Sequence, residues 1–588
     1  MLSHHRLLSL VVAAALPLLA SCASSSRPAT AATPVPATPP AGSLAGELPL
    51  KHAPQPTTAA ITAADLMTRL YIFADDSMQG REAGTPGHQK ATEYLAAQAQ
   101  AAGLLPAGEN GTYFQTVPMV TRQLAADAAL SVGGQPLVLG TDWAPVPPLA
   151  ASLPFGGSFT GTTQAIYGGR AGDVASYISP EQAHGKLVVL GAPVGPDGQP
   201  TFQFWSTGQL DRFKGAVAVA VATLHISPPP LVGYLSQPQQ MLQADLPADA
   251  PFGMIVTPAA AARLMGGAAL ATLRPGAAGA AVQGTLRFDN APTAAPTRNV
   301  VAVLPGSDPA LRGQYVLLGA HSDHVGMSET PVDHDSLRAY NAVVRPEGAE
   351  DEERAATPAE AARIATMLDG LRATHPRRQD TVFNGADDDG SGSVALLEIG
   401  QTLAAAPQKP RRSVLFVWHT AEEKGLFGSE WFAFHPTVPR DSIVAGLNID
   451  MIGRGGPQDV KGGGPRYMQL IGSRRLSTQL GDLVEQVNAS TGSRFTFDYT
   501  YDADGHPANI YCRSDHYNYA RFGIPVVFFT TGVHRDYHQL TDEPQYIDYE
   551  HFANVTRFID DVLAAVANLP QRPVVDKPKP DPYGVCQQ

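Results

Sequence analysis

The sequence predicts an α/β fold, in which a mostly parallel mixed sheet is flanked by helices. Two observations predict it. Apolar segments of strand length recur along the later part of the chain, and four of them end in histidine or carboxylate side chains, while a fifth leads into a histidine-bearing loop. Open parallel sheets bind ligands beyond the carboxyl ends of their strands, so this order predicts a polynuclear metal site at one sheet edge and a metallohydrolase. The segments are residues 315–324, 383–392, 413–423, 443–453 and 525–543.

Length and charge limit the possible classes. The chain has 588 residues, more than one hydrophobic core usually serves, so we expect two domains. Its formal net charge is −13, and no basic stripe is present that would contact phosphate groups. The charge therefore argues against nucleic acid as a partner.

The N-terminus has the features of a targeting signal. A short polar head precedes an apolar run from Leu7 to Leu19, which is too short to span a bilayer but suits a signal-peptide core. The run ends in Leu-Ala-Ser-Cys, which resembles the bacterial lipoprotein processing box and predicts lipid attachment at Cys22. We expect a lipid-anchored protein of the bacterial cell envelope. The alternative is ordinary signal cleavage, which would give a secreted protein.

Composition changes along the chain predict its domain organisation. Residues 22–56 are rich in Pro, Ala and Ser, which predicts a disordered linker. Helices are predicted over 63–73, 85–102 and 549–569, and a strand over 299–304 opens the series that carries the motifs. Between them, short β-like runs alternate with Pro/Gly loops and predict an inserted β-rich domain. The predicted boundaries are 1–21 for the signal peptide, 22–56 for the linker, 57–120 and 297–570 for the discontinuous main domain, 121–296 for the inserted domain and 571–588 for the tail.

Two features leave alternatives open. The segment 325–384 is longer than a strand connection needs, and Thr357 with Glu360 predicts a capped helix within it. This insert is either a lid over the site or packing decoration. Cys512 and Cys586 either form a disulfide that ties the tail to the main domain or remain free thiols.

The residue types at the predicted sheet edge suit a particular chemistry. Two histidines with several carboxylates and no cysteine favour Zn²⁺, with Co²⁺ or Mn²⁺ as alternatives, in a hydrolytic site. A carboxylate can bridge two metals about 3.5–4 Å apart, which then share a hydroxide. Glu422 and Glu423 are adjacent in an extended segment, so their side chains point opposite ways. One of them can bind a metal while the other acts as general base.

Taken together, the motifs HSDH, NGADDDGSG, AEEKGLFGS, NIDMIG and YHQLTDE resemble those of the dinuclear-zinc exopeptidases, a family that includes bacterial leucyl aminopeptidases and glutamate carboxypeptidase II. The segment QGREAGTPGHQKATEYL is similar to the opening segment of that family. HGKLVVLGAPVG and FKGAVAVAVA in the inserted domain resemble its protease-associated domain.

The resemblance implies roles for individual residues. One zinc ion would be held by His321 and Asp450, and the other by Glu423 and His538, with Asp388 as the bridge. Glu422 would be the general base, Asp323 would orient His321 from behind, and Tyr511 would bind the substrate carbonyl. The rival assignments are His534 as a ligand, Asp387 or Asp389 as the bridge, and structural or supporting roles for His324, His419 and His516.

The resemblance also implies a function: two zinc ions and an aminopeptidase that acts on peptides. The alternatives are a carboxypeptidase or dipeptidase of the same fold, a glutaminyl cyclase, and a non-catalytic binding lipoprotein.

Overall fold

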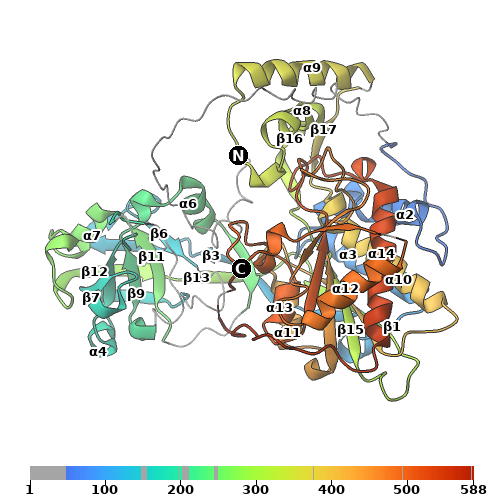
Figure 1. Cartoon of the computed structure of the whole chain (residues 1–588). Helices are drawn as coiled ribbons and strands as arrows, with labels where there is room; N and C mark the ends of the chain where they lie inside the picture. The colour runs from blue at the N-terminus through green and yellow to red at the C-terminus, as the bar shows by residue number, and fades with distance from the viewer. Residues whose placement is uncertain are drawn as a thin grey trace, which may run out of the picture.

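The computed structural model describes residues 48–147, 155–195, 198–201, 211–243, 249–374, 376–492, 494–584 and 586–588. The predicted signal peptide, Cys22 and most of the predicted linker lie outside these residues. Within them, no helix has both the length and the apolar character needed to cross a membrane. The predicted α/β class is confirmed, and Figure 1 shows a larger body on the right and a smaller one on the left.

The main domain is built on a nine-stranded mixed sheet. Its strands are β1 (Leu105–Pro106), β2 (Phe114–Thr116), β14 (Arg298–Leu304), β15 (Tyr315–His321), β18 (Ser413–His419), β19 (Ile443–Ile449), β20 (Tyr467–Ile471), β21 (Thr496–Asp498) and β22 (Val526–Thr530). The order is β1-β14-β18-β15-β19-β22-β20-β21, with β2 also paired to β14. The four central strands β18, β15, β19 and β22 are mutually parallel, whereas β14 and β20 pair with this block in the antiparallel sense. Their carboxyl ends therefore meet at one edge.

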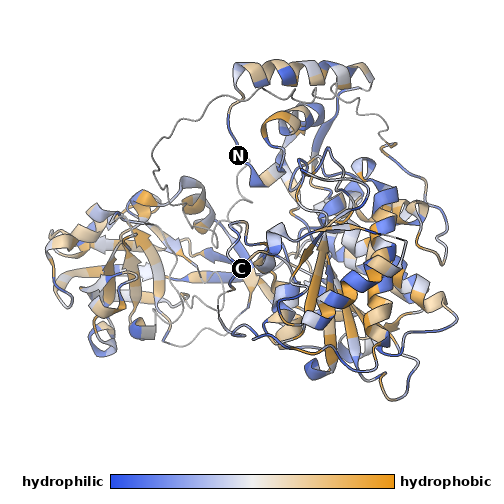
Figure 2. Ribbon diagram, in the orientation of Figure 1, coloured by the Kyte–Doolittle hydropathy of each residue, from blue (hydrophilic) through white to orange (hydrophobic). Residues whose placement is uncertain are grey.

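Helices cover both faces of this sheet. They are α2 (Ala63–Phe73), α3 (Pro86–Ala101), α10 (Gly392–Ala405), α11 (Phe427–Phe434), α12 (Thr478–Ser490), α13 (His516–Ala520) and α14 (Tyr549–Asn568). Along β15, Val316 and Leu318 face the cluster formed with α2, α3, α10, α12 and α14, while Leu317 faces the cluster formed with α11 and α13. A strand buried on both faces is apolar throughout rather than alternating, as the orange central strands of Figure 2 show.

The first two helices begin where their sequence signals place them. The side chain of Thr62 caps α2 by accepting a hydrogen bond from the N–H of Asp65. Thr85 caps α3 in the same way, and Pro86 occupies the first turn, where its missing N–H costs nothing. Between them, the turn at residues 76–81 runs into the sheet edge that carries the metal-type side chains.

The inserted domain contains an eight-stranded mixed sheet among its described residues, in the order β5-β4-β12-β7-β8-β9-β11-β6. The strands are β4 (Ala129–Val132), β5 (Gln135–Leu137), β6 (Trp143–Val146), β7 (Phe159–Arg170), β8 (Leu187–Gly191), β9 (Ala218–Val221), β11 (Phe252–Val256) and β12 (Ala278–Leu286). Short helices pack on both faces: α4 (Pro180–Ala183) and α6 (Pro229–Leu235) on one, α7 (Pro258–Leu264) on the other. The domain is therefore rich in strands, as the sequence predicts, but it is not built from strands alone.

A three-stranded sheet lies at the junction of the two domains (Figure 1). It consists of β3 (Met119–Leu124), β10 (Gln239–Leu242) and β13 (Phe288–Pro292). Val120 and Met241 from this sheet pack in one apolar cluster with Ala421 and Phe427 of the main domain. The junction thus lies directly against the loop that carries Glu422.

The insert 325–384 forms a separate layer above the main domain. It contains β16 (Met327–Asp333), α8 (His334–Val344), a short 3-10 turn at Gly348–Glu350, α9 (Pro358–Thr374) and β17 (Gln379–Val382). The predicted cap at Thr357 is present, because its side chain accepts a hydrogen bond from the N–H of Glu360. Most of α9 is exposed, and it forms the outer edge of the molecule in Figure 1.

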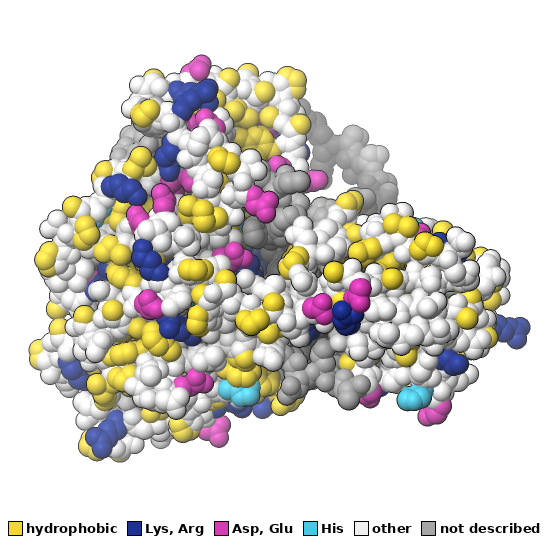
Figure 3. Space-filling model, turned by 180° about the vertical axis from the view of Figure 1, so that it is seen from behind, with side chains coloured by type: hydrophobic (Ala, Val, Ile, Leu, Met, Phe, Trp, Pro, Cys, Tyr) yellow, Lys and Arg dark blue, Asp and Glu magenta, His cyan; other side chains and the backbone are white. Residues whose placement is uncertain are grey.

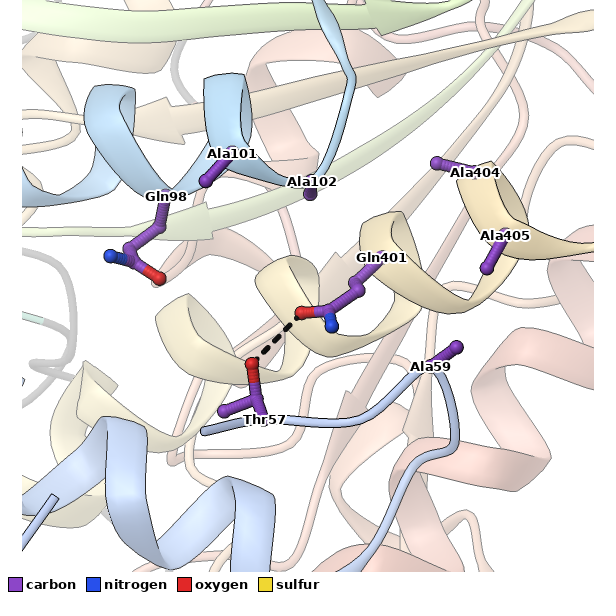
Figure 4. A pocket seen from close by; sticks show the side chains of 8 residues that line it. All are labelled: Thr57, Ala59, Gln98, Ala101, Ala102, Gln401, Ala404 and Ala405. Carbon is purple, nitrogen blue, oxygen red and sulfur yellow. Dashed lines mark hydrogen bonds between the residues drawn. The ribbon is translucent and has the colours of Figure 1, made fainter. Parts of the chain in front are cut away.

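Both ends of the described chain lie against the main domain. Thr57 donates a hydrogen bond of 3.1 Å to Gln401 of α10, and both residues line a pocket together with Gln98 and several alanines (Figure 4). At the other end, Cys586 forms a disulfide with Cys512, which resolves the alternative left open by the sequence. The molecular surface is mixed in charge, because acidic and basic side chains are interspersed on the face that Figure 3 shows.

Candidate metal centre

The five predicted metal ligands converge at one edge of the main sheet. His321 is the last residue of β15, and Asp450 follows β19 directly. Glu423 follows β18, and His538 lies in the loop after β22. Asp388 lies in the irregular turn before α10, which packs on the same sheet. Because β18, β15, β19 and β22 are adjacent and parallel, side chains separated by more than 200 residues meet here.

Two groups of donor atoms form around Asp388. On one side, His321 Nε2 lies 3.1 Å from Asp388 Oδ1 and 3.6 Å from Asp450 Oδ1. On the other, His538 Nε2 lies 2.9 Å from Asp388 Oδ2 and 2.9 Å from Glu423 Oε2. Each oxygen of Asp388 therefore faces a different histidine–carboxylate pair, which is the arrangement a bridging carboxylate requires.

The two neighbouring acids, Asp387 and Asp389, have hydrogen-bond partners of their own. Asp387 accepts a hydrogen bond of 2.6 Å from the N–H of Gly453, and its other oxygen lies 3.1 Å from His534 Nε2. The carboxylate of Asp389 accepts hydrogen bonds from three backbone N–H groups. Among the three consecutive acids, Asp388 is the one that lies against both His321 and His538. The rival positions Asp387 and His534 contact each other. A carboxylate oxygen of Asp389 also lies within 4.8 Å of the ligand atoms of His321 and Asp450, so Asp389 borders the first donor group.

The adjacent glutamates have opposite electrostatic environments. Burial raises the pKa of Glu422 well above its ordinary value, and the nearby carboxylate of Asp450 adds to this effect. Burial acts in the same direction on Glu423, but the charges of His538 and the hydrogen bonds from His324 and His538 outweigh it and lower its pKa to about 2. A pair of carboxyl groups with separated pKa values divides naturally into a proton-transfer group and a permanent anion. The side chain of Glu422 is 10% exposed, so water reaches it.

Polar groups behind the ligands fix their orientation. The Nδ1–H of His321 donates to the backbone carbonyl of Asp323 at 3.1 Å, which leaves Nε2 free to bind a metal. The carboxylate of Asp323 lies farther from that ring, at 3.9 Å, and instead accepts from the N–H of Glu422. Ser514 donates a hydrogen bond of 2.7 Å to Asp450. Asp323 thus contacts the ring of His321 through its backbone carbonyl, and its carboxylate holds the backbone of Glu422.

Arg81 is a supporting residue that sequence reasoning missed. Its side chain is fully buried and donates to the backbone carbonyls of Ser322, Asn384 and Gly385. These carbonyls belong to the two loops that carry His321 and Asp388, so one guanidinium holds both loops together. The sequence contains one signal for this residue, an arginine inside the Gly-rich turn QGREAG. No apolar run surrounds it there, and burying a charge is costly unless polar groups pair with it.

Strained backbone also gathers at this edge. Ala421, Met451 and His538 have φ values of 54°, 61° and 53°, in the left-handed region that non-glycine residues rarely adopt. Ala421 directly precedes Glu422, Met451 directly follows Asp450, and His538 is itself a predicted ligand. Such strain costs about 1–3 kcal/mol per residue and persists only where surrounding contacts enforce it.

Other predicted residues lie outside the donor set. The ring of Tyr511 packs against His516, Tyr517 and the guanidinium of Arg475, which agrees with a packed tyrosine more than with a group that binds substrate. His419, which is fully buried, contacts the hydroxyl of Tyr519 at 2.6 Å and a carboxylate oxygen of Asp515 at 3.2 Å. His324 is different, because its ring reaches Glu423 inside the cluster.

A third histidine–carboxylate cluster joins the insert to the main domain. His334 Nδ1 lies 3.2 Å from Asp380, and its Nε2 lies 3.4 Å from Glu543. The guanidinium of Arg378 contacts both acids and His334. Since an arginine already supplies the positive charge, this cluster is an ion-pair network rather than a metal site.

The main cluster fits zinc. It offers histidine nitrogens and carboxylate oxygens without thiolates, the donor set of hydrolytic zinc sites. His321 Nε2 and Asp388 Oδ2 are buried and lack a hydrogen bond of acceptable geometry, which is costly unless a cation binds them. His538, 12% exposed, and Glu422 open the cluster to solvent.

The chain is similar to several known proteins. Residues 299–563, which include every proposed ligand and Glu422, match the family described as Peptidase family M28. Leupeptin-inactivating enzyme 1 of Streptomyces exfoliatus is 40% identical over 81 residues, covering 13% of this chain and 18% of that protein. Aminopeptidase Y of Saccharomyces cerevisiae is 26% identical over 199 residues, covering 31% of this chain and 34% of that protein.

Among solved structures, the aminopeptidase from Aneurinibacillus sp. strain AM-1 is 16% identical, with a TM-score of 0.45, and the match covers 88% of this chain and 97% of that one. The chain spans less than half the length of the curated relatives it matches. The relationship to peptidase family M28 therefore applies to the segment 299–563.

Metal removal is expected to destabilise the protein. Without a cation, burial raises the pKa of Glu422, so the folded state binds that proton more tightly than the unfolded chain, and stability falls as pH rises above the ordinary glutamate pKa of about 4.3. Zinc at about 100 times its Kd should add about 2.7 kcal/mol for each ion, which corresponds to about 2–4 °C in Tm for a protein of this size. Thermal unfolding with EDTA and with zinc, at pH 5 and pH 8, measures both effects. Identical Tm values with and without chelator would contradict the metal assignment.

Proposed function

We propose that this chain is a zinc-dependent exopeptidase of the M28 type, an aminopeptidase that removes N-terminal residues from peptides and works with two zinc ions. One observation carries the proposal: the two oxygens of Asp388 face separate histidine–carboxylate pairs, at 3.1 Å from His321 and 2.9 Å from His538. The residues that would hold the ions are His321 and Asp450 for one, Glu423 and His538 for the other, and Asp388 for both. Co²⁺ and Mn²⁺ fit the same donors.

The residues of the chain divide the chemistry among themselves. Zinc, when bound, supplies a Lewis acid and lowers the pKa of water to about 7. Glu422, with its raised pKa and partly exposed carboxylate, accepts the proton of the attacking water and delivers it to the nitrogen of the leaving amine. Glu423 stays ionised and serves as a ligand. Asp323 holds the backbone of Glu422 through a hydrogen bond of 3.1 Å, so the proton-transfer group starts from a fixed position.

We also propose that the inserted domain is a protease-associated domain. The two segments that carry the resemblance, HGKLVVLGAPVG and FKGAVAVAVA, contribute β8 and β9, which pair in parallel in the middle of the eight-stranded sheet.

Lipid attachment at Cys22 remains a proposal that rests on the sequence motif. It would anchor the protein in a bacterial envelope through the linker that precedes residue 57. Globomycin treatment of the native host is expected to trap a heavier precursor, and unchanged mobility would contradict the anchor.

A substrate pair tests the type of exopeptidase. The zinc-loaded protein is expected to cleave leucyl-p-nitroanilide and to leave its N-acetylated form intact, because an aminopeptidase requires the free amine. Spectrophotometric release of p-nitroaniline measures both. Failure on both substrates with two metals bound would favour a carboxypeptidase, a dipeptidase or, if N-terminal glutamine is cyclised, a glutaminyl cyclase. A metal content near zero would favour a non-catalytic binding protein.

The assignment of the two glutamates gives a paired test. Glu422→Gln should retain both metals and lose about 10²–10⁴-fold in kcat, since general-base catalysis contributes a factor of that size. Glu423→Ala should instead lose one metal, measured by elemental analysis of the dialysed protein. Full activity of Glu422→Gln would contradict its role as the base.

A further inference from the structure

His324 lies inside the cluster without belonging to the proposed ligand set. Its Nδ1 is 2.7 Å from Glu423 Oε1 and 3.7 Å from Asp388 Oδ2, and the residue is fully buried. The ring stands roughly perpendicular to that of His538, with centroids 5.5 Å apart. Two imidazoles therefore approach the same glutamate from different sides.

The two imidazoles use different oxygens of Glu423. His324 Nδ1 lies against Oε1, whereas His538 Nε2 lies 2.9 Å from Oε2. The 2.7 Å distance is that of a charge-assisted hydrogen bond, and a carboxylate oxygen can only accept, so the ring carries its proton on Nδ1 and donates it to Oε1. Oε1 is thereby occupied, and Oε2 is the oxygen left for a metal.

The backbone and the surroundings hold the ring in this orientation. The N–H of His324 donates to the carbonyl of Arg81 at 3.2 Å, and Gly326 donates to Gly80 at 3.0 Å, so the loop is bound to the buried turn before α3. On the other side, the ring lies against Gly385. A Cβ on that glycine would come within 2.5 Å of ring atoms Cγ and Cδ2. The imidazole thus has little freedom to turn away from Glu423.

From this geometry we infer that His324 is a positioning residue, which donates its Nδ1–H to Glu423 Oε1 and so makes Glu423 bind the second metal through Oε2 alone. The inference rests on the proposed dinuclear site and adds a residue to it. Ligating carboxylates are commonly oriented by such outer hydrogen bonds, whose loss costs about 10–100-fold in metal affinity.

The test compares the full chain with His324→Ala and His324→Asn. The amide nitrogen of asparagine can occupy the place of Nδ1 and donate the same hydrogen bond, whereas alanine cannot. Titration of zinc against a chromophoric chelator measures the affinity of each site separately. The alanine variant is expected to lose about 10–100-fold at one of the two sites and to keep the other, and the asparagine variant is expected to recover most of the loss.

A matched control is His551→Asn in α14. His551 is buried and donates to the carbonyl of Pro465, outside the metal cluster, so its substitution should leave both zinc affinities unchanged. Circular dichroism verifies that each variant is folded.

Two results would overturn the inference. Wild-type zinc affinities in the folded alanine variant would mean that the hydrogen bond does not position Glu423. An asparagine variant as weak as alanine, with a changed visible spectrum after Co²⁺ substitution, would make His324 a ligand itself. The wild-type metal count separates these outcomes from failure of the proposed function: fewer than two metals in the wild-type protein removes the dinuclear site and the inference together.

Discussion

The structure depends on the burial of several carboxylates at one edge of an apolar sheet. Asp388, Glu422, Glu423 and Asp450 lie in a region from which most water is excluded, where like charges repel strongly. Positive charge must accompany them. Part comes from Arg81, which is fully buried. Burial lowers the pKa of Arg81 to about 10, while the charges of Asp542, Asp388, Asp323 and Asp389 act to raise it and keep the guanidinium charged. Divalent cations bound by His321, His538 and these carboxylates would supply the remaining positive charge.

Strand register brings the charged side chains to one edge of the sheet. His321 pairs with His419 in β18, and Gly319 pairs with Asn448 in β19, so Asp450 stands level with His321 across the sheet. The apolar strands give the ligands a rigid frame, because they are packed on both faces and cannot shift without disturbing the core. His321 and Asp450 lie directly at strand ends, where residues keep their spacing more closely than on free loops.

Much of this could be predicted from the sequence, for a local reason. Each predicted ligand follows an apolar run or lies in a short motif, so strand ends and ligand types follow from neighbouring residues. The same holds for the helices predicted over 63–73 and 549–569, which the structure has at Ala63–Phe73 and Tyr549–Asn568. Three features could not be predicted from neighbouring residues, because they depend on segments far apart in the chain. They are the role of Arg81, the His324–Glu423 hydrogen bond and the choice between disulfide and free thiols. Arg81, for example, meets carbonyls 241 and 304 positions away. Positive φ at Ala421 and His538 has no sequence signal either, since neither is glycine.

The insert 325–384 also contacts a distant segment, the loop that carries His538. His538 lies in a loop without regular structure and has φ of 53°, so its position needs support from outside the loop. The insert supplies it: Ala349 donates to the carbonyl of Tyr537 at 3.0 Å, Asn341 contacts Gln539 at 3.3 Å, and no side chain fits at Gly348, which packs against the same loop. Glu350 extends these contacts by an ion pair of 2.5 Å with Arg513. A freely opening lid would break these contacts and loosen the loop that carries His538, a proposed metal ligand, with each opening. The contacts therefore favour an insert that is part of the frame of the metal centre, with its exposed helix α9 outside that frame.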